Sequence, residues 1–238
     1  MKCQDLQTFL LHCSVKKGET ATHTRIGNPK LNIRGGRYFI NYEDKDVFKL
    51  FKTLYCKAVY DKKYSEYLTE LQDRETGGPI LIDLDFQFNK SQTERIFDDD
   101  VVKDMVDAYV EEITTIFNFE NIQEFEIYVL MKDEPSIQKD FSKDGIHIQI
   151  NLKCNHNLQL FLRERIKKKI NDDIFLPSGF EFKNNIDDIF DKSISSGQTG
   201  WLCYGSKKPG GKPYKIISKF LVNVDDDNDY QISEVSLA

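Results

Sequence analysis

Two aspartates that stand two residues apart in an apolar run are the residues best placed to do chemistry. The run from Ile80 to Phe88 alternates with period two, which is the pattern of a half-buried strand. Asp83 and Asp85 then project side by side from the face opposite the apolar side chains, with Cα atoms about 6.5–7 Å apart. Two such carboxylates repel each other unless a hard cation lies between them. The pattern predicts a divalent-metal site on a central strand, and the alternative is a pair of solvated aspartates on an edge strand.

A second polar group precedes and enters another alternating run, residues 145–152. His147 falls on the face opposite the isoleucines of this run, and Ser142 and Lys143 come just before it. Gly145 allows a ligand to approach the backbone closely. Histidine, serine and lysine can all donate to phosphate oxygens. Because a strand histidine alone is more often structural, this group indicates phosphate binding only together with other motifs.

A third group combines a carboxylate with a basic turn. Asp191 follows two apolar residues and is a third candidate carboxylate. The turn Gly205-Ser206-Lys207-Lys208 joins a permissive backbone to a hydroxyl and two ammonium groups, which predicts a phosphate cradle. This turn is not a P-loop, because Gly211 stands where that motif has its lysine.

The elements that position these groups can be predicted from apolar spacing. Helical spacing predicts helices over residues 5–13, 44–71, 102–116 and 158–174. Strand patterns occur at residues 38–40, 80–88, 125–130 and 145–152, and strands with Gly/Pro turns are expected from 201 to 224. No internal repeat is visible, so we expect one mixed α/β unit that can consist of two lobes.

Composition and cysteine usage restrict the class of protein. The chain has 238 residues, of which 39% are hydrophobic and 30% charged, so it can form a globular core. No apolar run reaches the roughly 18 residues of a membrane span, and the N-terminus has no secretory pattern, so we expect an intracellular protein. The five cysteines are scattered without a C-x-x-C pair, and Cys154 with His156 lacks two further convergent ligands, so neither disulfides nor a structural zinc site is expected.

The net charge of −6 hides two basic segments. Residues 192–224 contain six lysines and no acidic residue, and residues 15–41 contain six basic residues against Glu19. Such segregation is typical of a local phosphate-binding surface, and a solvated lysine-rich face explains it equally well.

The three motifs, in this order, resemble the archaeo-eukaryotic primase superfamily. Ile82-Asp83-Leu84-Asp85-Phe86 is similar to the first motif of that superfamily, Gly145-Ile146-His147 to the second and Phe190-Asp191-Lys192-Ser193 to the third. The most similar branch is the primase domain at the N-terminus of the D5-like helicase-primases of nucleocytoplasmic large DNA viruses. The segments His23-Thr24-Arg25-Ile26 and Gly35-Gly36-Arg37-Tyr38 also resemble this branch.

This resemblance implies an α+β fold with two lobes, an α/β N-terminal lobe packed on an RRM-like lobe, and an active site in the cleft. It implies that residues 1–238 form one catalytic domain. Because the sequence has no Walker A motif, the helicase half is absent, and the domain is expected either as the N-terminal part of a longer helicase-primase or as a stand-alone primase. A fused or associated superfamily 3-type helicase is then the expected partner, and no membrane partner is expected. For a viral protein, the expected location is the host cytoplasm or a replication factory.

The activity implied by the resemblance is template-directed primer synthesis on single-stranded DNA from nucleoside triphosphates, with two divalent cations, Mg²⁺ or Mn²⁺. The implied metal ligands are Asp83, Asp85 and Asp191, and His147 completes the catalytic set. The implied nucleotide-binding residues are Ser142, Lys143, His147, Lys207 and Lys208. The weaker candidates for template contacts are Arg25, Arg34, Arg37, Lys212 and Lys215.

Two other readings of the motifs remain open. A metal-dependent phosphohydrolase can also carry Asp-x-Asp on a strand, although Gln87 stands where the haloacid-dehalogenase pattern has threonine. A non-catalytic RRM-like module for single strands would use exposed aromatics, whereas Phe86 and Phe88 fall on the apolar face. A divalent-metal titration separates the cases, because a binding module needs no metal.

Overall fold

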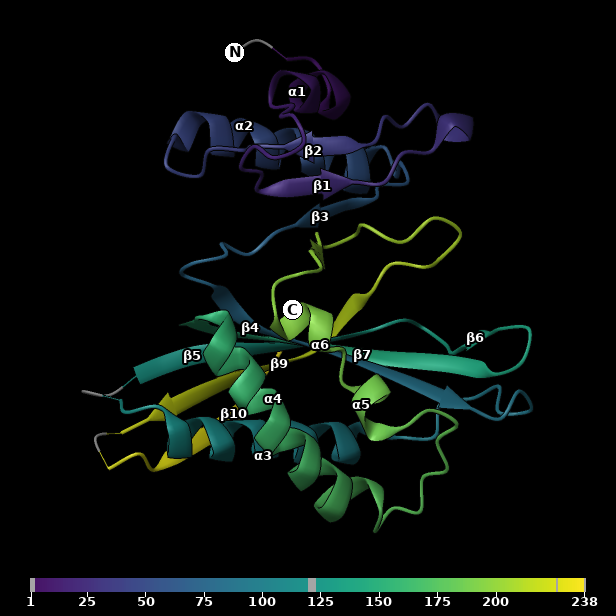
Figure 1. The fold of residues 1–238 in the computed structure, drawn as a ribbon, viewed down its shortest axis with the longest axis vertical. Coiled ribbons are helices and arrows are strands. Elements are labelled where there is room, and N and C mark those ends of the chain that lie inside the picture. Colours follow the sequence, from purple (N-terminus) through teal and green to yellow (C-terminus); the bar gives the residue numbers. More distant parts are fainter. Residues whose placement is uncertain (1–2, 120–122, 226, 238) are drawn as a thin grey trace. The chain divides into compact units, whose positions relative to one another are not determined.

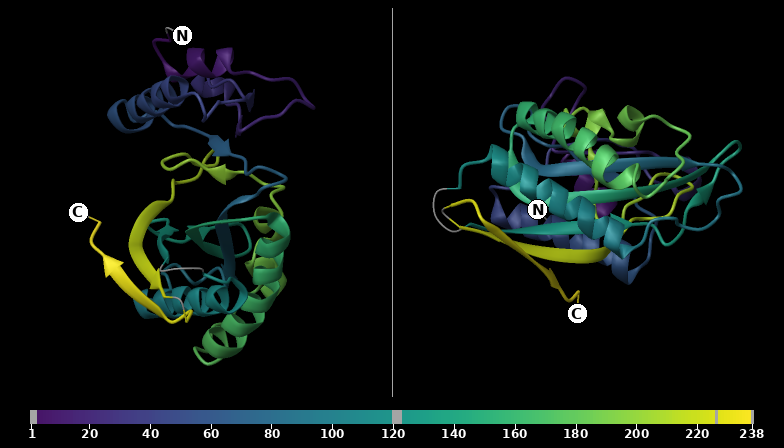
Figure 2. Two further views of the ribbon diagram at one scale, coloured as in Figure 1. Left: turned by 90° about the vertical axis from the view of Figure 1, so that its left-hand side faces the viewer. Right: turned by 90° about the horizontal axis from the view of Figure 1, so that it is seen from below.

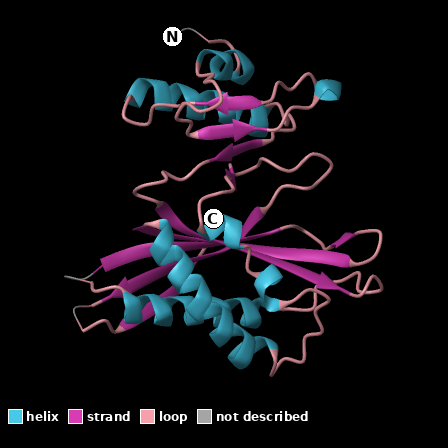
Figure 3. Ribbon diagram, viewed as in Figure 1, coloured by secondary structure: helices cyan, strands magenta, loops and turns pink. Residues whose placement is uncertain are grey.

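The chain divides into two compact units, each of which combines segments distant in sequence. The computed structural model describes residues 3–119, 123–225 and 227–237. Unit 1 consists of Met1–Asp73 and Thr199–Tyr214, and unit 2 of Arg74–Gln198 and Lys215–Ala238. Among the described residues the strands form two sheets in which all strand pairs are antiparallel (Figure 3). Within this part of the chain the helices therefore do not connect neighbouring parallel strands. This confirms the predicted α+β class.

Unit 1 is built on a four-stranded sheet in the order β2-β1-β3-β8 (Figure 1). Its strands are β1 (His23–Arg25), β2 (Gly36–Tyr38), β3 (Leu68–Glu70) and β8 (Trp201–Leu202). Its helices are α1 (Leu6–His12), α2 (Lys45–Cys56), a 3₁₀ turn (Pro29–Leu31) and a π turn (Lys57–Asp61). Asp5 caps α1 by accepting from the Thr8 amide at 2.8 Å, as its position before the helix predicts. Phe9, Ile40 and Phe51 belong to a core separate from that of unit 2.

The helix predicted over residues 44–71 is wrong in its second half. The α-helix ends at Cys56, and after the π turn Lys63 adopts a left-handed conformation with φ +53°. A non-glycine residue in that region breaks the helical path. Leu68–Glu70 is instead a strand that pairs with β1 and β8. The strand predicted at residues 38–40 ends earlier, at Tyr38.

Unit 2 contains a six-stranded sheet in the order β10-β9-β5-β7-β4, with β6 paired to β7. Its strands are β4 (Gly78–Phe88), β5 (Gln123–Met131), β6 (Ser136–Ile137), β7 (Ser142–Cys154), β9 (Lys215–Val224) and β10 (Tyr230–Val235). Its helices are α3 (Asp99–Ile116), α4 (His156–Ile170), a π turn (Asn171–Phe175), α5 (Ile186–Ile189) and α6 (Lys192–Ser195). The long helices α3 and α4 lie along one face of this sheet (Figure 2).

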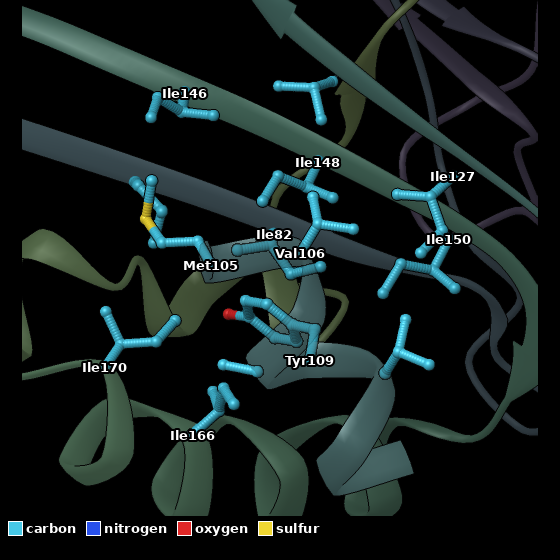
Figure 4. Packing of buried hydrophobic residues seen from close by; sticks show 14 of the residues in the cluster. Ile82, Met105, Val106, Tyr109, Ile127, Ile146, Ile148, Ile150, Ile166 and Ile170 are labelled. Atoms are coloured by element: carbon cyan, nitrogen blue, oxygen red, sulfur yellow. The ribbon is translucent and has the colours of Figure 1, made fainter. Parts of the chain in front are cut away.

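The core of unit 2 lies between that face of the sheet and the two long helices. Ile146, Ile148 and Ile150 of β7 are fully buried and point toward residues of α3 and α4 such as Met105 and Ile166 (Figure 4). Ile82 of β4 joins the same cluster, so the alternation predicted for both strands holds. Burying one face in this way leaves the opposite face of β4 and β7 free to carry polar groups.

The position of β4 in the sheet differs from the prediction of a central strand. Strand β4 ends the ordered path of the sheet, and only β7 pairs with it as a named strand. Its outer edge is covered by residues 183–191, which form an isolated bridge between Leu84 and Phe190. The apolar residues of β4 led to the prediction of a central strand, but the outer edge of this strand is buried by a loop. The alternation of the sequence does not distinguish burial by a loop from burial between two strands. Among the described residues, no helix is long and apolar enough to cross a membrane.

Candidate functional site

Asp83 and Asp85 lie on the same face of β4, as their spacing predicts. Their neighbours Leu84 and Phe86 are buried on the core face, at 0% and 1% exposure. The side chains of Asp83 and Asp85 keep 11% and 25% of their surface exposed. The strand therefore presents two partly shielded carboxylates away from the hydrophobic core.

Strand β7 places a cationic or imidazole partner beside each carboxylate. His147 stands directly opposite Asp83 in the antiparallel register, and its Nε2 lies 3.3 Å from Oδ1 of Asp83. The Lys143 ammonium lies 2.8 Å from Oδ1 of Asp85, diagonally across the two strands. The residue opposite Asp85 is Gly145, which adds no side chain above that carboxylate. The second sequence motif thus packs against the first.

Asp191 lies beside Asp83, on the segment that covers the edge of β4. Its backbone N–H donates to the Asp83 carbonyl oxygen at 3.0 Å. Earlier in this segment, the Asn184 side chain donates to the Asp85 carbonyl at 2.8 Å and accepts from the Gln87 amide at 3.0 Å. The edge of β4 is therefore satisfied by hydrogen bonds with a loop, and this pairing brings the third aspartate next to the first.

The Asp191 carboxylate is oriented by the short helix that follows it. Its Oδ1 accepts from the backbone N–H and the hydroxyl of Ser193, both at 2.8 Å, as an N-cap of α6. Among the described residues its second oxygen, Oδ2, accepts no hydrogen bond. Asp83, Asp191 and Ser195 line one pocket beside β4.

The donor set suits a hard cation, although a closed shell is not formed. Carboxylate oxygens are the ligands preferred by Mg²⁺ and Mn²⁺, and Asp83 and Asp85 share one strand face beside Asp191. Among the described residues, however, no three His, Cys, Asp or Glu side chains converge as a metal cluster. Lys143 and His147 instead lie against the carboxylates. The residues present fit a cation that displaces those two partners.

Ser142 departs from its predicted place among the nucleotide contacts. The residue is fully buried, and its hydroxyl has no hydrogen-bond partner among the described residues. It lies at the start of β7, between Phe88 of β4 and Ile137 of β6. In this conformation a triphosphate cannot reach its hydroxyl, whereas Lys143 keeps 31% of its side chain exposed.

Several residues that support the site carry no recognisable sequence signal. Arg95 forms a two-pronged ion pair with buried Asp144, at 2.7 and 3.0 Å, directly before Gly145. Asn184 and Arg163 hold backbone carbonyls of β4 and of the segment before Asp191. These contacts join residues far apart in the chain, so only the folded structure reveals them.

The basic turn of the third motif belongs to unit 1, whereas the three aspartates belong to unit 2. The Ser206 hydroxyl is buried and accepts from the Leu68 amide at 3.2 Å, so it anchors the turn within unit 1. Gly205 has φ +88°, and a Cβ there would come within 2.6 Å of Val59. Lys208 is exposed and Lys207 half-buried. Nucleotide binding by these two lysines stays a prediction.

The candidate template residues have different surroundings. Arg25 is buried, and its guanidinium binds both oxygens of Glu66 at 2.7 and 2.6 Å, which leaves it little surface for a DNA phosphate. Arg34 is exposed, and Arg37 is half-buried with an Nε that has no partner among the described residues. The Lys215 ammonium in unit 2 pairs with Asp133 at 2.8 Å in an exposed position. Lys212 lies in unit 1 and is exposed.

Comparison with known proteins identifies the family that has these motifs. The family described as "C962R protein N-terminal AEP domain" matches residues 27–220, where AEP denotes archaeo-eukaryotic primase. The chain is also 30% identical over 230 residues to the "Putative helicase L207/L206" of Acanthamoeba polyphaga mimivirus. That alignment covers 95% of this chain and 23% of the viral protein, so the chain spans about a quarter of that relative. Because the family match extends over most of the chain and includes all three aspartates, the chain belongs to the archaeo-eukaryotic primase superfamily.

Proposed function

We propose that this chain is a primase catalytic domain that makes primers on single-stranded DNA from nucleoside triphosphates. The observation that carries the proposal is the shared carboxylate face of β4, where Asp83 and Asp85 project together and Asp191 is bonded to the same strand. Members of the superfamily are generally nucleotidyltransferases, and this arrangement supplies the oxygen ligands that nucleotidyl transfer on phosphates needs.

In the proposed reaction a 3′-hydroxyl oxygen forms a bond to the α-phosphorus of the incoming nucleotide. The bond from that phosphorus to the pyrophosphate oxygen breaks, pyrophosphate leaves, and the hydroxyl proton passes to solvent water. Two divalent cations, when bound, supply activation of the attacking oxygen and stabilisation of the leaving oxygen. Asp83 and Asp85 would hold them from β4, with Oδ2 of Asp191 as the third protein ligand.

Lys143 and His147 have a second role in this proposal. Each lies against a carboxylate, at 2.8 and 3.3 Å, and thereby offsets the repulsion between Asp83 and Asp85 before a cation arrives. With the carboxylates neutralised, the lysine ammonium and the imidazole would be free to donate to the triphosphate oxygens. The site therefore exchanges internal partners for metal and nucleotide, which keeps it folded in both states.

We further propose that this domain works together with a helicase. The similar mimivirus protein is named a putative helicase, and this chain matches 23% of its length. A primase domain that shares a chain with a helicase, or associates with one, would receive the single strand that the helicase releases. The proposal of a helicase partner rests on the similarity to the mimivirus protein, and not on a contact made by the described residues.

The function can be tested by incubating the protein with single-stranded DNA, labelled nucleotides and Mn²⁺ or Mg²⁺. Ribonucleotides and deoxyribonucleotides are supplied in separate reactions, and a chelator is added to a parallel set. The proposal predicts new labelled oligomers that require both the DNA and the cation. Metal-independent DNA binding without any oligomer would instead identify a non-catalytic binding module.

A further inference from the structure

A buried arginine outside the proposed ligand set contacts the segment that delivers Asp191. Arg163 lies on α4, and its side chain is only 5% exposed. Its Nε and Nη2 donate to the Phe190 carbonyl oxygen at 2.9 and 2.6 Å, and Nη2 also donates to the Asp187 carbonyl at 2.9 Å. One guanidinium therefore holds two backbone carbonyls of the segment immediately before Asp191.

The Phe190 carbonyl and the Asp191 amide belong to the same planar peptide group. Arg163 binds the carbonyl end of this group, and the Asp83 carbonyl accepts from its N–H end at 3.0 Å. A planar group fixed at both ends cannot rotate, so the position of the Asp191 Cα is set, and the two bonds from Ser193 to Oδ1 then set the direction of the side chain. Strand β4 and helix α4 thus hold the third aspartate between them.

Burial of a charged side chain for packing alone is unfavourable, because desolvation of the guanidinium is costly. The carboxylates near Arg163 belong to Glu164 and Asp187, whose side chains are 53% and 66% exposed. The donors directed inward go to backbone carbonyls rather than to a buried acid. This arrangement favours a role in fixing the backbone over a role in forming an ion pair.

We propose that Arg163 is a positioning residue for the Asp191 carboxylate, and through it for the cation site. The effect of Arg163 on cation binding and catalysis rests on the proposed function. The structural part of the inference, the fixed peptide between Phe190 and Asp191, does not depend on that function. Loss of a side chain that orients a metal ligand typically weakens metal affinity 10–100-fold.

The test compares Arg163→Met, which removes every donor, with Arg163→Lys, which keeps the charge and one donor direction. Mn²⁺ affinity is measured by calorimetry or electron paramagnetic resonance, and hydrogen exchange of the Asp191 amide by NMR. We expect Arg163→Met to weaken Mn²⁺ binding about tenfold or more and to speed exchange of that amide. Arg163→Lys should recover part of both losses, and kcat should fall more than the nucleotide KM rises.

The control is Ile166→Ala, a core change on the same helix at a side chain that has no polar group to donate to the Asp191 segment. It should lower the Tm while leaving Mn²⁺ affinity and Asp191 exchange as in the wild type. Wild-type exchange and Mn²⁺ affinity in Arg163→Met would overturn the inference. If the wild type itself binds no Mn²⁺, the proposed function fails, and faster exchange in Arg163→Met still supports the positioning role.

Discussion

Each unit carries a buried histidine in a strand, His147 at 7% and His23 at 2% exposure, and the two differ in what surrounds them. His147 of unit 2 lies on the sheet face away from the core, beside Asp83. His23 of unit 1 is 2% exposed and packs against the Phe51 ring at 5.2 Å. Arg25, on the same face of β1 as His23, is buried in its ion pair with Glu66. Unit 2 thus presents its strand polar groups to a site, whereas unit 1 uses its own inside the fold.

The difference teaches that residue type alone does not assign a polar side chain to function. Both strands contain histidine near basic residues, but only in β7 do isoleucines occupy three successive alternate positions, 146, 148 and 150, and turn the histidine away from the core. The three residues of β1 are too short a run for that pattern to be read. We therefore expect substitutions in unit 1 to change stability and those on the β4–β7 face to change activity.

The largest expected effect concerns the buried ion pair of unit 1. Glu66→Gln removes the charge that compensates Arg25, whose side chain is 5% exposed, and leaves a buried guanidinium unpaired. The free energy of unfolding of unit 1 should fall by about 3–5 kcal/mol, measured by denaturant titration. The double variant Arg25→Met, Glu66→Met should regain much of that loss. A change below about 1 kcal/mol for Glu66→Gln would mean that the pair is not structural.

The next effect concerns the carboxylates of unit 2. Asp83→Ala or Asp85→Ala should reduce primer synthesis at least about a hundredfold, or roughly 2.7 kcal/mol of transition-state stabilisation, because each removes a proposed cation ligand. The unfolding transition should change little, since both side chains lie outside the core. Gln87→Ala, on the same strand face, serves as the matched control and should keep activity. Full synthesis by both aspartate variants would remove the basis for the site.

An intermediate effect should appear in the acid stability of unit 1. Burial lowers the pKa of His23 from 6.5 to about 4. As the pH falls below about 6.5, the unfolded chain takes up a proton that the folded chain does not. Stability should therefore decrease by about 1.4 kcal/mol per pH unit until the pH nears 4. Thermal unfolding from pH 7 to 4 measures this slope.

The control for this pH dependence is a histidine in a different setting. His23→Leu should flatten the slope in unit 1, whereas His12→Asn, at an exposed position on α1, should preserve it. An unchanged slope in His23→Leu would show that another group determines the acid sensitivity.

The smallest expected effect concerns surface lysines and DNA. Lysines that neutralise phosphates release counterions, so affinity for a single strand falls with salt at a slope of about 0.7 per contact. Lys212→Ala and Lys215→Ala should each flatten that slope by about one contact and weaken binding equally on every sequence. The effect of Lys215 should be the smaller, because its ammonium already pairs with Asp133. A salt-independent affinity would indicate that these lysines form only a solvated face.

Sequence alone predicted the parts of unit 2 that depend on local pattern. Period-two alternation located β4 and β7, and the spacing of Asp83 and Asp85 placed both on one face. The sequence pattern did not predict that β4 lies at the end of the sheet. A strand whose edge is covered by a loop has the same apolar pattern as a strand between two others. The contacts of Arg163 with Phe190 and of Asn184 with Asp85 depend on that loop, so the sequence contained no sign of them.

In unit 1 the sequence was less informative, because its strands are short and its polar groups are internal. Arg25 has the residue type of a phosphate contact, yet its partner Glu66 is 41 residues away in the chain. The α-helix predicted as far as residue 71 ends at Cys56, and after the π turn the left-handed Lys63 keeps the chain from resuming it, a conformation that residue type does not specify. Tertiary pairing decided both outcomes.

The most direct test of the whole account is a Mn²⁺ titration of the folded protein, followed by calorimetry or electron paramagnetic resonance without DNA or nucleotide. The account predicts saturable binding by the wild type and by Gln87→Ala. It predicts at least about tenfold weaker binding by Asp83→Asn and by Asp85→Asn, because each loses a charged oxygen ligand. Equal Mn²⁺ affinity in the wild type and both aspartate variants would contradict the claim that the polar face of β4 is the cation site.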